Sequence, residues 1–211
     1  DFTISTEAVT EALQRLQPKM FAFAAASNVL GTEFPVQQWT SLAHQCGSTV
    51  LIDAAQAAPH KQIDVQAWNA DFVVFSGHKI CGPNAIGVLY GKEALLDLMP
   101  PFLGGGAMIH RVTIEGFEPA ELPEKFEAGT PPIVEAIGLE AAIDYVSQWG
   151  LDQIEAHERS LCAHADAGLR AIDGVRIIGP SPEKKSGIVS FVIDGVHSHD
   201  VAQQLDTRGI A

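Results

Sequence analysis

The sequence predicts an α/β fold in which a mainly parallel sheet is flanked by helices. Short apolar runs alternate with helix-like stretches, and the runs over residues 49–52 and 71–75 are almost wholly apolar. Continuous apolar strands belong to sheets that are covered on both faces, as in layered α/β proteins. Asn28, Asp53 and Ser76 follow or end such runs. Ligands gather at the carboxyl ends of parallel strands, so these polar residues predict a binding site.

Composition excludes several classes of protein. The chain has 211 residues, of which 46% are hydrophobic and 18% are charged, so it can bury a sizeable core. Its formal net charge of −13 argues against nucleic-acid binding, which needs clustered lysine and arginine. No apolar run approaches the roughly 18 residues of a membrane span, and no secretory leader pattern opens the sequence. We expect a soluble, cytoplasmic protein.

The first half of the chain predicts alternating helices and strands. Ser5 or Thr6 caps a first helix that ends near Leu16. Pro35 begins a second helix, and Gly47 ends it. The strands that we expect between and after these helices cover residues 20–26, 49–52, 71–75 and 86–90.

The amino-acid composition changes after residue 100. Residues 100–132 are rich in glycine and proline and show no long periodic run, which predicts a functional loop or hairpin, either a lid or a subunit contact. Helices over 133–149 and 152–172 follow, with Gly150 between them. Strands over 175–178 and 188–193 and a helix over 200–208 then begin a smaller α/β unit.

This pattern divides the chain into two parts. We expect residues 1–150 to form part of a large ligand-binding domain, and residues 151–211 to supply a bridging helix and part of a small domain. The chain starts without a methionine and stops where another strand is expected. We therefore expect a piece of a longer protein.

Lys79 and Asp53 form a pattern that suits pyridoxal phosphate (PLP). Asp53 ends one apolar run, and the next run leads into Ser76-Gly77-His78-Lys79. PLP needs a lysine for its imine and a buried carboxylate that keeps its pyridine nitrogen protonated. The stretch of sequence between Asp53 and Lys79 is long enough for one crossover connection and one strand. Both side chains can therefore reach one pocket.

Each of these residues also has an ordinary explanation when it is taken singly. Asn28, Asp53 and Ser76 are common turn or cap residues, and a lysine, histidine or threonine in a turn is often only solvated. The convergence of several such residues at strand ends favours a site.

Cysteine and histidine do not predict a metal site. The three cysteines, Cys46, Cys81 and Cys162, are far apart and lack metal-ligand spacing, so reduced structural thiols are expected. His197 and His199 lie close together but have no acidic or thiolate partner nearby, which favours exposed residues at a helix start.

Five motifs together resemble the class V aminotransferase superfamily, and most of all its SUF-type (group II) cysteine desulfurases. The resemblance covers nearly the whole chain and corresponds to the middle of such an enzyme. It implies the type I fold of PLP-dependent transferases. The motifs are Ser27-Asn28-Val29-Leu30-Gly31-Thr32, Asp53-Ala54-Ala55-Gln56, Phe75-Ser76-Gly77-His78-Lys79, Gly104-Gly105-Gly106-Ala107-Met108-Ile109 and Phe126-Glu127-Ala128-Gly129-Thr130-Pro131.

The resemblance implies a role for each matching residue. Lys79 is expected to be the Schiff-base lysine and afterwards the base that moves protons on the substrate. Asp53 is expected to pair with the pyridinium nitrogen, and Gln56 to hydrogen-bond the phenolic oxygen. Asn28 is expected to face the substrate carboxylate or the edge of the cofactor.

The cofactor phosphate has three expected ligands. The resemblance implies that Ser76 and His78 hold the phosphate of this chain's own PLP. It also implies that Thr130 reaches the phosphate in the partner subunit of a homodimer.

The reaction implied by the resemblance takes sulfur from L-cysteine and yields alanine and an enzyme persulfide, which a sulfur-acceptor protein receives for iron–sulfur cluster assembly. The persulfide cysteine of such enzymes lies in a C-terminal motif that none of the three cysteines matches. Other class V enzymes share the aspartate and the lysine, so a selenocysteine lyase, a kynureninase-like hydrolase or an aminotransferase stays open. A non-catalytic piece that keeps the fold stays open as well.

Overall fold

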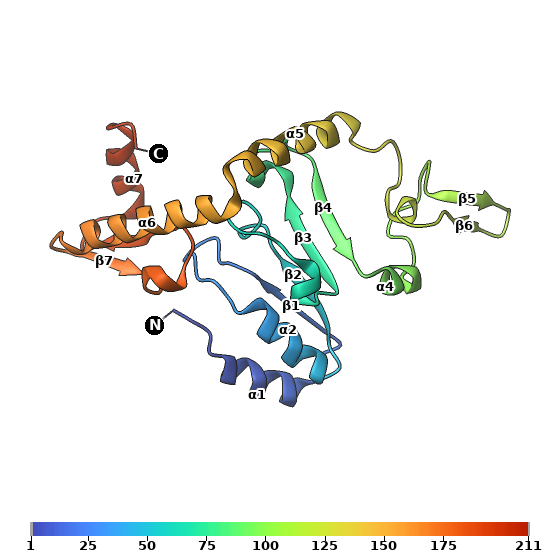
Figure 1. Cartoon of the computed structure of the whole chain (residues 1–211), viewed down its shortest axis with the longest axis horizontal. Helices are drawn as coiled ribbons and strands as arrows, with labels where there is room; N and C mark the ends of the chain where they lie inside the picture. Colours follow the sequence, from blue (N-terminus) through green and yellow to red (C-terminus); the bar gives the residue numbers. More distant parts are fainter. Residues whose placement is uncertain (1, 211) are drawn as a thin grey trace.

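A four-stranded sheet forms the centre of the computed structural model, which describes residues 2–210 (Figure 1). The order along the sheet is β1-β2-β3-β4, with β1 parallel to β2, β2 parallel to β3, and β4 antiparallel to β3. The prediction of an α/β fold with a mainly parallel sheet is confirmed. The strands are β1 Met20–Ala24, β2 Thr49–Asp53, β3 Phe72–Ser76 and β4 Gly87–Gly91.

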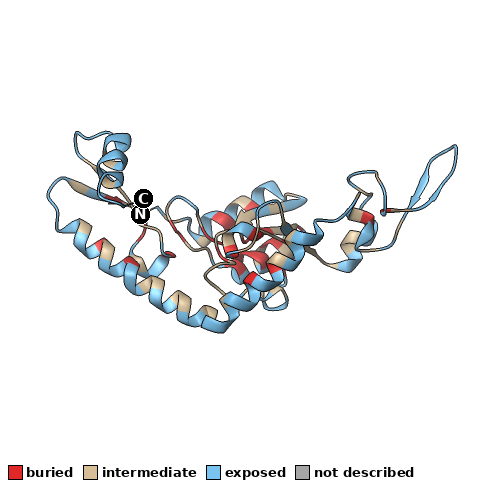
Figure 2. Ribbon diagram, turned by 90° about the horizontal axis from the view of Figure 1, so that it is seen from above, coloured by how far each residue is buried: buried red, intermediate tan, exposed pale blue. Residues whose placement is uncertain are grey.

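The first helices pack beside this sheet. α1 spans Thr6–Leu16, and its cap is Ser5, whose hydroxyl accepts a 3.1 Å hydrogen bond from the Ala8 amide. α2 spans Val36–Gln45 and buries Trp39, which is 2% exposed. Figure 2 shows the buried residues gathered around the sheet and its helices. The main hydrophobic cluster contains Val9, Leu13, Ala25, Val36, Trp39, Ala43, Val50, Ile52, Ala54, Ala57, Ala70 and Val73.

Two short helices were not expected from the sequence. α3 spans Val65–Trp68, capped by the Asp64 carboxylate, which accepts from the Gln66 and Ala67 amides. α4 spans Glu93–Leu98. Helices of four and six residues are too short to show a hydrophobic period, so pattern reading misses them.

The segment rich in glycine and proline forms a two-stranded hairpin, which confirms one of its two expected structures. Its strands are β5 Ile109–Val112 and β6 Phe117–Pro119. Both views show the hairpin reaching away from the sheet (Figures 1 and 2). A short 3₁₀ helix, η2 Glu124–Phe126, follows, and the Lys125 ammonium donates to the carbonyls of Leu96 and Asp97.

Two long helices connect the sheet to the C-terminal part. α5 spans Ile133–Trp149 and α6 spans Leu151–Arg170, with Gly150 at a φ of 78° between them. α6 runs from the end of α5 to the separate sheet at the other side of Figure 1. That part contains β7 Val175–Ile178, η3 Pro182–Lys184, β8 Ser190–Ile193 and α7 Ser198–Asp206.

The C-terminal sheet is antiparallel, and its connecting loop carries a buried lysine. β7 pairs with β8, and Lys185 between them is fully buried. Its ammonium lies 3.4 Å from Asp166 of α6, which also pairs with Arg170. Within residues 2–210, no helix has both the length and the apolar character to cross a membrane.

Candidate functional site at the strand ends

Three neighbouring strands end at the same edge of the sheet. Ala24 at the end of β1 is in register with Asp53 at the end of β2, and Asp53 is in register with Val74 of β3. Parallel strands direct the segments that follow them to one side, so the turn after β1, Asp53 and the turn after β3 share this edge. The structure thus places Asn28, Asp53 and Ser76 as the sequence predicted.

Lys79 lies in a tight turn directly after β3. The 3₁₀ helix η1, Gly77–Ile80, follows Ser76, and the Gly82 amide closes the turn with a 2.9 Å bond to the Gly77 carbonyl. A Cβ on Gly82 would lie 2.7 Å from that carbonyl oxygen and 3.0 Å from Leu139 of α5. Only glycine fits so close an approach. The backbone around Lys79 is therefore held between β3 and α5.

Asp53 differs from its expected burial. One oxygen of its carboxylate accepts a 2.9 Å hydrogen bond from the Ala55 amide, but the residue is exposed. The pattern of Asp53 and Lys79 predicted a buried carboxylate, and this prediction is wrong for residues 2–210. Asp53 is the last residue of β2, and no described helix or loop covers its side chain there.

Several predicted site residues present unpaired polar groups at this edge. In the described part of the chain, the side chains of Asn28, Gln56, Ser76, His78 and Lys79 form no hydrogen bond or ion pair with other residues. Lys79, Gln56 and Ser76 are half-buried, whereas His78 and Asn28 are exposed. Such groups are free to bind a polar ligand.

The turn that carries Asn28 is held by the C-terminal part of the chain. The Ser27 hydroxyl accepts from the amides of Val29 and Leu30, each at 3.2 Å. The Ser190 hydroxyl donates to the Val29 carbonyl, and the Ser186 amide donates to the Gly31 carbonyl at 2.9 Å. The position of Asn28 therefore depends on residues more than 150 positions later in the sequence.

Thr130 lies apart from the other predicted residues. It is exposed and precedes α5, next to Gly129, whose amide donates to the Gly106 carbonyl at 2.8 Å. Within residues 2–210 its side chain forms no hydrogen bond with the Lys79 turn, which packs against Leu139 farther along α5. The structure brings the Gly104–Gly106 and Thr130 motifs together, but not at the strand ends.

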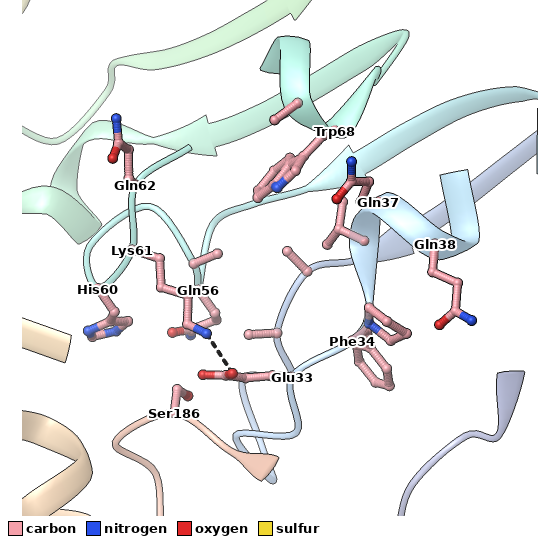
Figure 3. Close-up of a pocket in the computed structure, with 16 residues that line it drawn as sticks. Glu33, Phe34, Gln37, Gln38, Gln56, His60, Lys61, Gln62, Trp68 and Ser186 are labelled. Carbon is pink, nitrogen blue, oxygen red and sulfur yellow. Dashed lines mark hydrogen bonds and ion pairs between the residues drawn. The ribbon is translucent and has the colours of Figure 1, made fainter. Parts of the chain in front are cut away.

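A cavity of about 490 Å³ adjoins this edge, and sequence reasoning missed it (Figure 3). Of the predicted site residues, only Gln56 lines it. Figure 3 shows Gln56 and Lys61 on one side, with Lys61 joined to Glu33, and Trp68 across the cavity. No local pattern marks Glu33 or Lys61, because their pairing joins two loops that lie far apart in the sequence.

The whole chain, including the strand ends and the Lys79 turn, matches a known protein family. A model of the family described as aminotransferase class V matches residues 1–211. The chain belongs to this family. Its membership agrees with the resemblance that the five motifs carry.

Named relatives of this class-V chain include cysteine desulfurases. A protein of Streptomyces coelicolor named probable cysteine desulfurase is 48% identical over 100% of this chain and 50% of its own length. The apo structure of a cysteine desulfurase from Thermococcus onnurineus matches with a TM-score of 0.94 and 38% identity, over 99% of this chain and 52% of that one. The cysteine desulfurase CsdA from Escherichia coli matches with a TM-score of 0.90 and 38% identity, over 96% and 51%.

The class-V chain spans about half the length of the curated relatives it matches. The solved cysteine desulfurases share its α/β architecture over nearly all of its residues, which confirms the expected type I fold.

The cysteines of the class-V chain are dispersed. Cys46 is half-buried at the end of α2, Cys81 is exposed two residues after Lys79, and Cys162 is buried in α6. Burial raises the pKa of the Cys162 thiol. At the start of α7, the His197 ring accepts a hydrogen bond from the His199 amide, as expected for a helix start.

Proposed function

We propose that the whole protein is a PLP-dependent cysteine desulfurase of the SUF type. The observation that carries this proposal is the placement of Asp53 and the Ser76–Lys79 turn at neighbouring strand ends, with polar groups free for a ligand. Relatives named cysteine desulfurases that are 45–50% identical over nearly the whole chain support it.

The residues at the strand ends fit PLP chemically. The Lys79 amine would hold the cofactor covalently, and the Asp53 carboxylate would pair with its pyridinium nitrogen. The amide of Gln56 would donate to the phenolic oxygen. Because Lys79 and Gln56 have no partner among residues 2–210, neither interaction needs a bond of the protein to be broken.

The phosphate would be bound by hydroxyl and imidazole groups. Ser76 and His78 lie at the start of the η1 turn and have no protein partner in the described chain. Thr130, which lies apart, would bind the phosphate in the partner subunit of a homodimer. This division explains why one motif residue stands away from the others.

Bound PLP supplies an electron sink for the electrons of a breaking substrate bond. The Lys79 amine, once free, would take the proton from the substrate α-carbon and return a proton when alanine forms. Asn28 would orient the substrate carboxylate or the cofactor edge. The half-buried place of Lys79 in a turn held by α5 would restrict its amine to this region.

Sulfur transfer needs a thiolate that attacks the sulfur of L-cysteine, so that a sulfur–sulfur bond forms as the carbon–sulfur bond breaks. We assign this role to none of the cysteines of this chain. Cys162 is buried and Cys46 lies at the far end of α2. Cys81 is exposed two residues after Lys79, but like the other two it does not match the C-terminal persulfide motif of such enzymes. We propose that a cysteine outside these 211 residues carries the persulfide to an acceptor protein in the cytoplasm for iron–sulfur cluster assembly.

The two parts of the chain have separate tasks in this proposal. Residues 1–150 would form part of a large PLP-binding domain, and residues 151–211 would supply the bridging helix and part of a small domain. The separate sheets β1–β4 and β7–β8 support this division.

Absorbance tests the cofactor. The whole protein purified with PLP should absorb in the visible region, and borohydride should bleach this band. Lys79→Ala should abolish the band, whereas Lys19→Ala, at an exposed lysine before β1, should keep it. A colourless wild-type protein that takes up no added PLP would rule out the proposed cofactor.

Product analysis tests the reaction. With L-cysteine and a thiol reductant, the wild-type protein should release sulfide and alanine in equal amounts. Release of selenide from selenocysteine alone, or transamination without sulfide, would instead assign the protein to another class V activity.

A further inference from the structure

Four charged side chains form a closed ring beside the candidate site. Lys61 lies 2.5 Å from Glu33 and 3.3 Å from Glu155. Arg159 lies 2.7 Å from Glu155 and 3.3 Å from Glu33. Positive and negative charges thus alternate around the ring, and each side chain contacts both of its neighbours.

The ring joins the two loops that carry predicted site residues to a single helix. Glu33 belongs to the loop after β1, which contains Asn28, and Lys61 belongs to the loop after β2, which contains Gln56. Glu155 and Arg159 stand one turn apart on α6. Figure 3 shows the Lys61–Glu33 pair beside Gln56, at the wall of the cavity.

Partial burial strengthens the ring relative to a surface ion pair. Its side chains are 19–37% exposed, so solvent screens their charges incompletely. Burial alone would raise the pKa of the Glu155 carboxyl, but Arg159 and Lys61 outweigh burial and hold that pKa below its ordinary value. Removing one member would leave two half-buried like charges to share the single remaining partner, which is costly.

Further bonds attach the same loops to the C-terminal part. His60, next to Lys61, lies 2.7 Å from Glu158 of α6. The Glu33 amide donates to the Lys184 carbonyl at 3.1 Å. Since the side chains of Asn28 and Gln56 have no hydrogen bonds of their own among residues 2–210, their positions follow from the loops.

We propose that the ring of Glu33, Lys61, Glu155 and Arg159 is a positioning element that sets the separation between the Asn28 loop and the Gln56 loop. In this role the ring acts through those two residues. This role rests on the proposed PLP function.

Charge exchange within α6 provides a sharp test. The double variant Glu155→Arg with Arg159→Glu keeps the net charge and a pair one turn apart on α6, but it sets like charges against Lys61 and Glu33. In the whole protein, the dissociation constant for PLP should rise about tenfold, and KM for L-cysteine should rise more than kcat falls, because both loops shift. Adding Glu33→Lys and Lys61→Glu restores the alternation and should recover most of the PLP affinity.

A matched control separates positioning from stability. Lys92→Met breaks the Lys92–Asp71 pair at the opposite end of β3, and it should lower Tm while leaving the PLP dissociation constant and the absorption maximum unchanged. If the α6 double variant failed to fold, Lys61→Met would report the same quantities.

Three results would contradict the role. The ring variants could lower Tm and leave PLP affinity, absorption maximum and KM unchanged, which would make the ring purely structural. The fourfold exchange could fail to recover PLP affinity although the protein folds. If wild-type protein bound no PLP at all, the proposed function would fail first, and the positioning role with it.

Discussion

Asp53 stands opposite Val74 in the parallel register of β2 and β3, two residues before β3 ends at Ser76. This register places the Asp53 carboxylate one strand away from the turn that carries Lys79. The two groups that PLP chemistry requires therefore leave the sheet at one edge, although no hydrogen bond or ion pair joins them within residues 2–210.

Asp53→Asn should impair turnover far more than cofactor binding. The amide keeps the size of the side chain but loses the charge that would pair with the pyridinium nitrogen, and such electrostatic contacts are worth roughly a hundredfold or more in kcat. Absorbance should show PLP still bound through Lys79, while sulfide release falls by that factor. Asp64→Asn, the same change at the α3 cap, should leave kcat unaltered. Equal activity of the two variants would contradict the role of Asp53.

Asp71→Asn should destabilise the fold strongly. This carboxylate is 9% exposed and accepts from the Val50 amide, from His44 and from Lys92, each at 2.8 Å. The neutral variant leaves Lys92 without its counter-ion, and we expect a loss of about 3 kcal/mol in the free energy of unfolding, measured by urea denaturation. Asp173→Asn, at an exposed residue, should change that free energy by less than about 0.5 kcal/mol. Similar losses in both variants would show that the Asp71 network contributes little.

Acid should weaken the fold through the same carboxylate. Burial alone would raise the pKa of Asp71, but hydrogen bonds from Lys92, His44 and the Val50 amide hold that pKa below its ordinary 3.8. A carboxyl with a lowered folded-state pKa stabilises the protein above its unfolded pKa, and the contribution is lost as pH falls through the folded pKa. The stability difference between wild type and Asp71→Asn should therefore shrink as the pH falls below about 4. A difference that does not change with pH would contradict this assignment.

Gly31→Ala should destabilise the fold more than Gly47→Ala does. Gly31 has a φ of +70°, and a Cβ there would lie 3.1 Å from the Cβ of Ile188 and 3.3 Å from that of Lys185. Gly47 has a φ of +76° but nothing within 4 Å, so Gly47→Ala isolates the backbone strain. Thermal unfolding should show Gly31→Ala to be less stable by about 1–3 kcal/mol beyond the effect of Gly47→Ala, because the added methyl overpacks the loop. Equal losses of stability in the two variants would mean that the loop containing Lys185 and Ile188 moves to accommodate the added methyl group.

Most of the architecture could be predicted from the sequence, because local signals mark it. Ser5 caps the first helix as expected, and the apolar runs that end at Asp53 and Ser76 are strands. The boundaries differ by up to a few residues, for example β1 ends at Ala24 rather than at residue 26. A strand ends where its backbone groups stop forming hydrogen bonds with the neighbouring strand, and an apolar run in the sequence does not indicate that point.

Other features depend on pairing between distant segments. The sequence does not show that β4 runs antiparallel to β3, since an apolar run has no direction. It predicted a buried Asp53, and the structure exposes this residue. Burial is decided by what covers a side chain, and the residues nearby in sequence do not supply that cover.

The sequence by itself determined the kind of fold, the candidate lysine and carboxylate and the turn between them, because periodicity, capping and turn chemistry act over a few residues. Only the tertiary structure decided that Glu33 and Lys61 meet Glu155 and Arg159 in one ring and that Ser190 holds the Asn28 turn. Charges are common on any surface. Which of them come within 4 Å depends on how the chain packs helix against sheet, and that packing is set by the whole core at once.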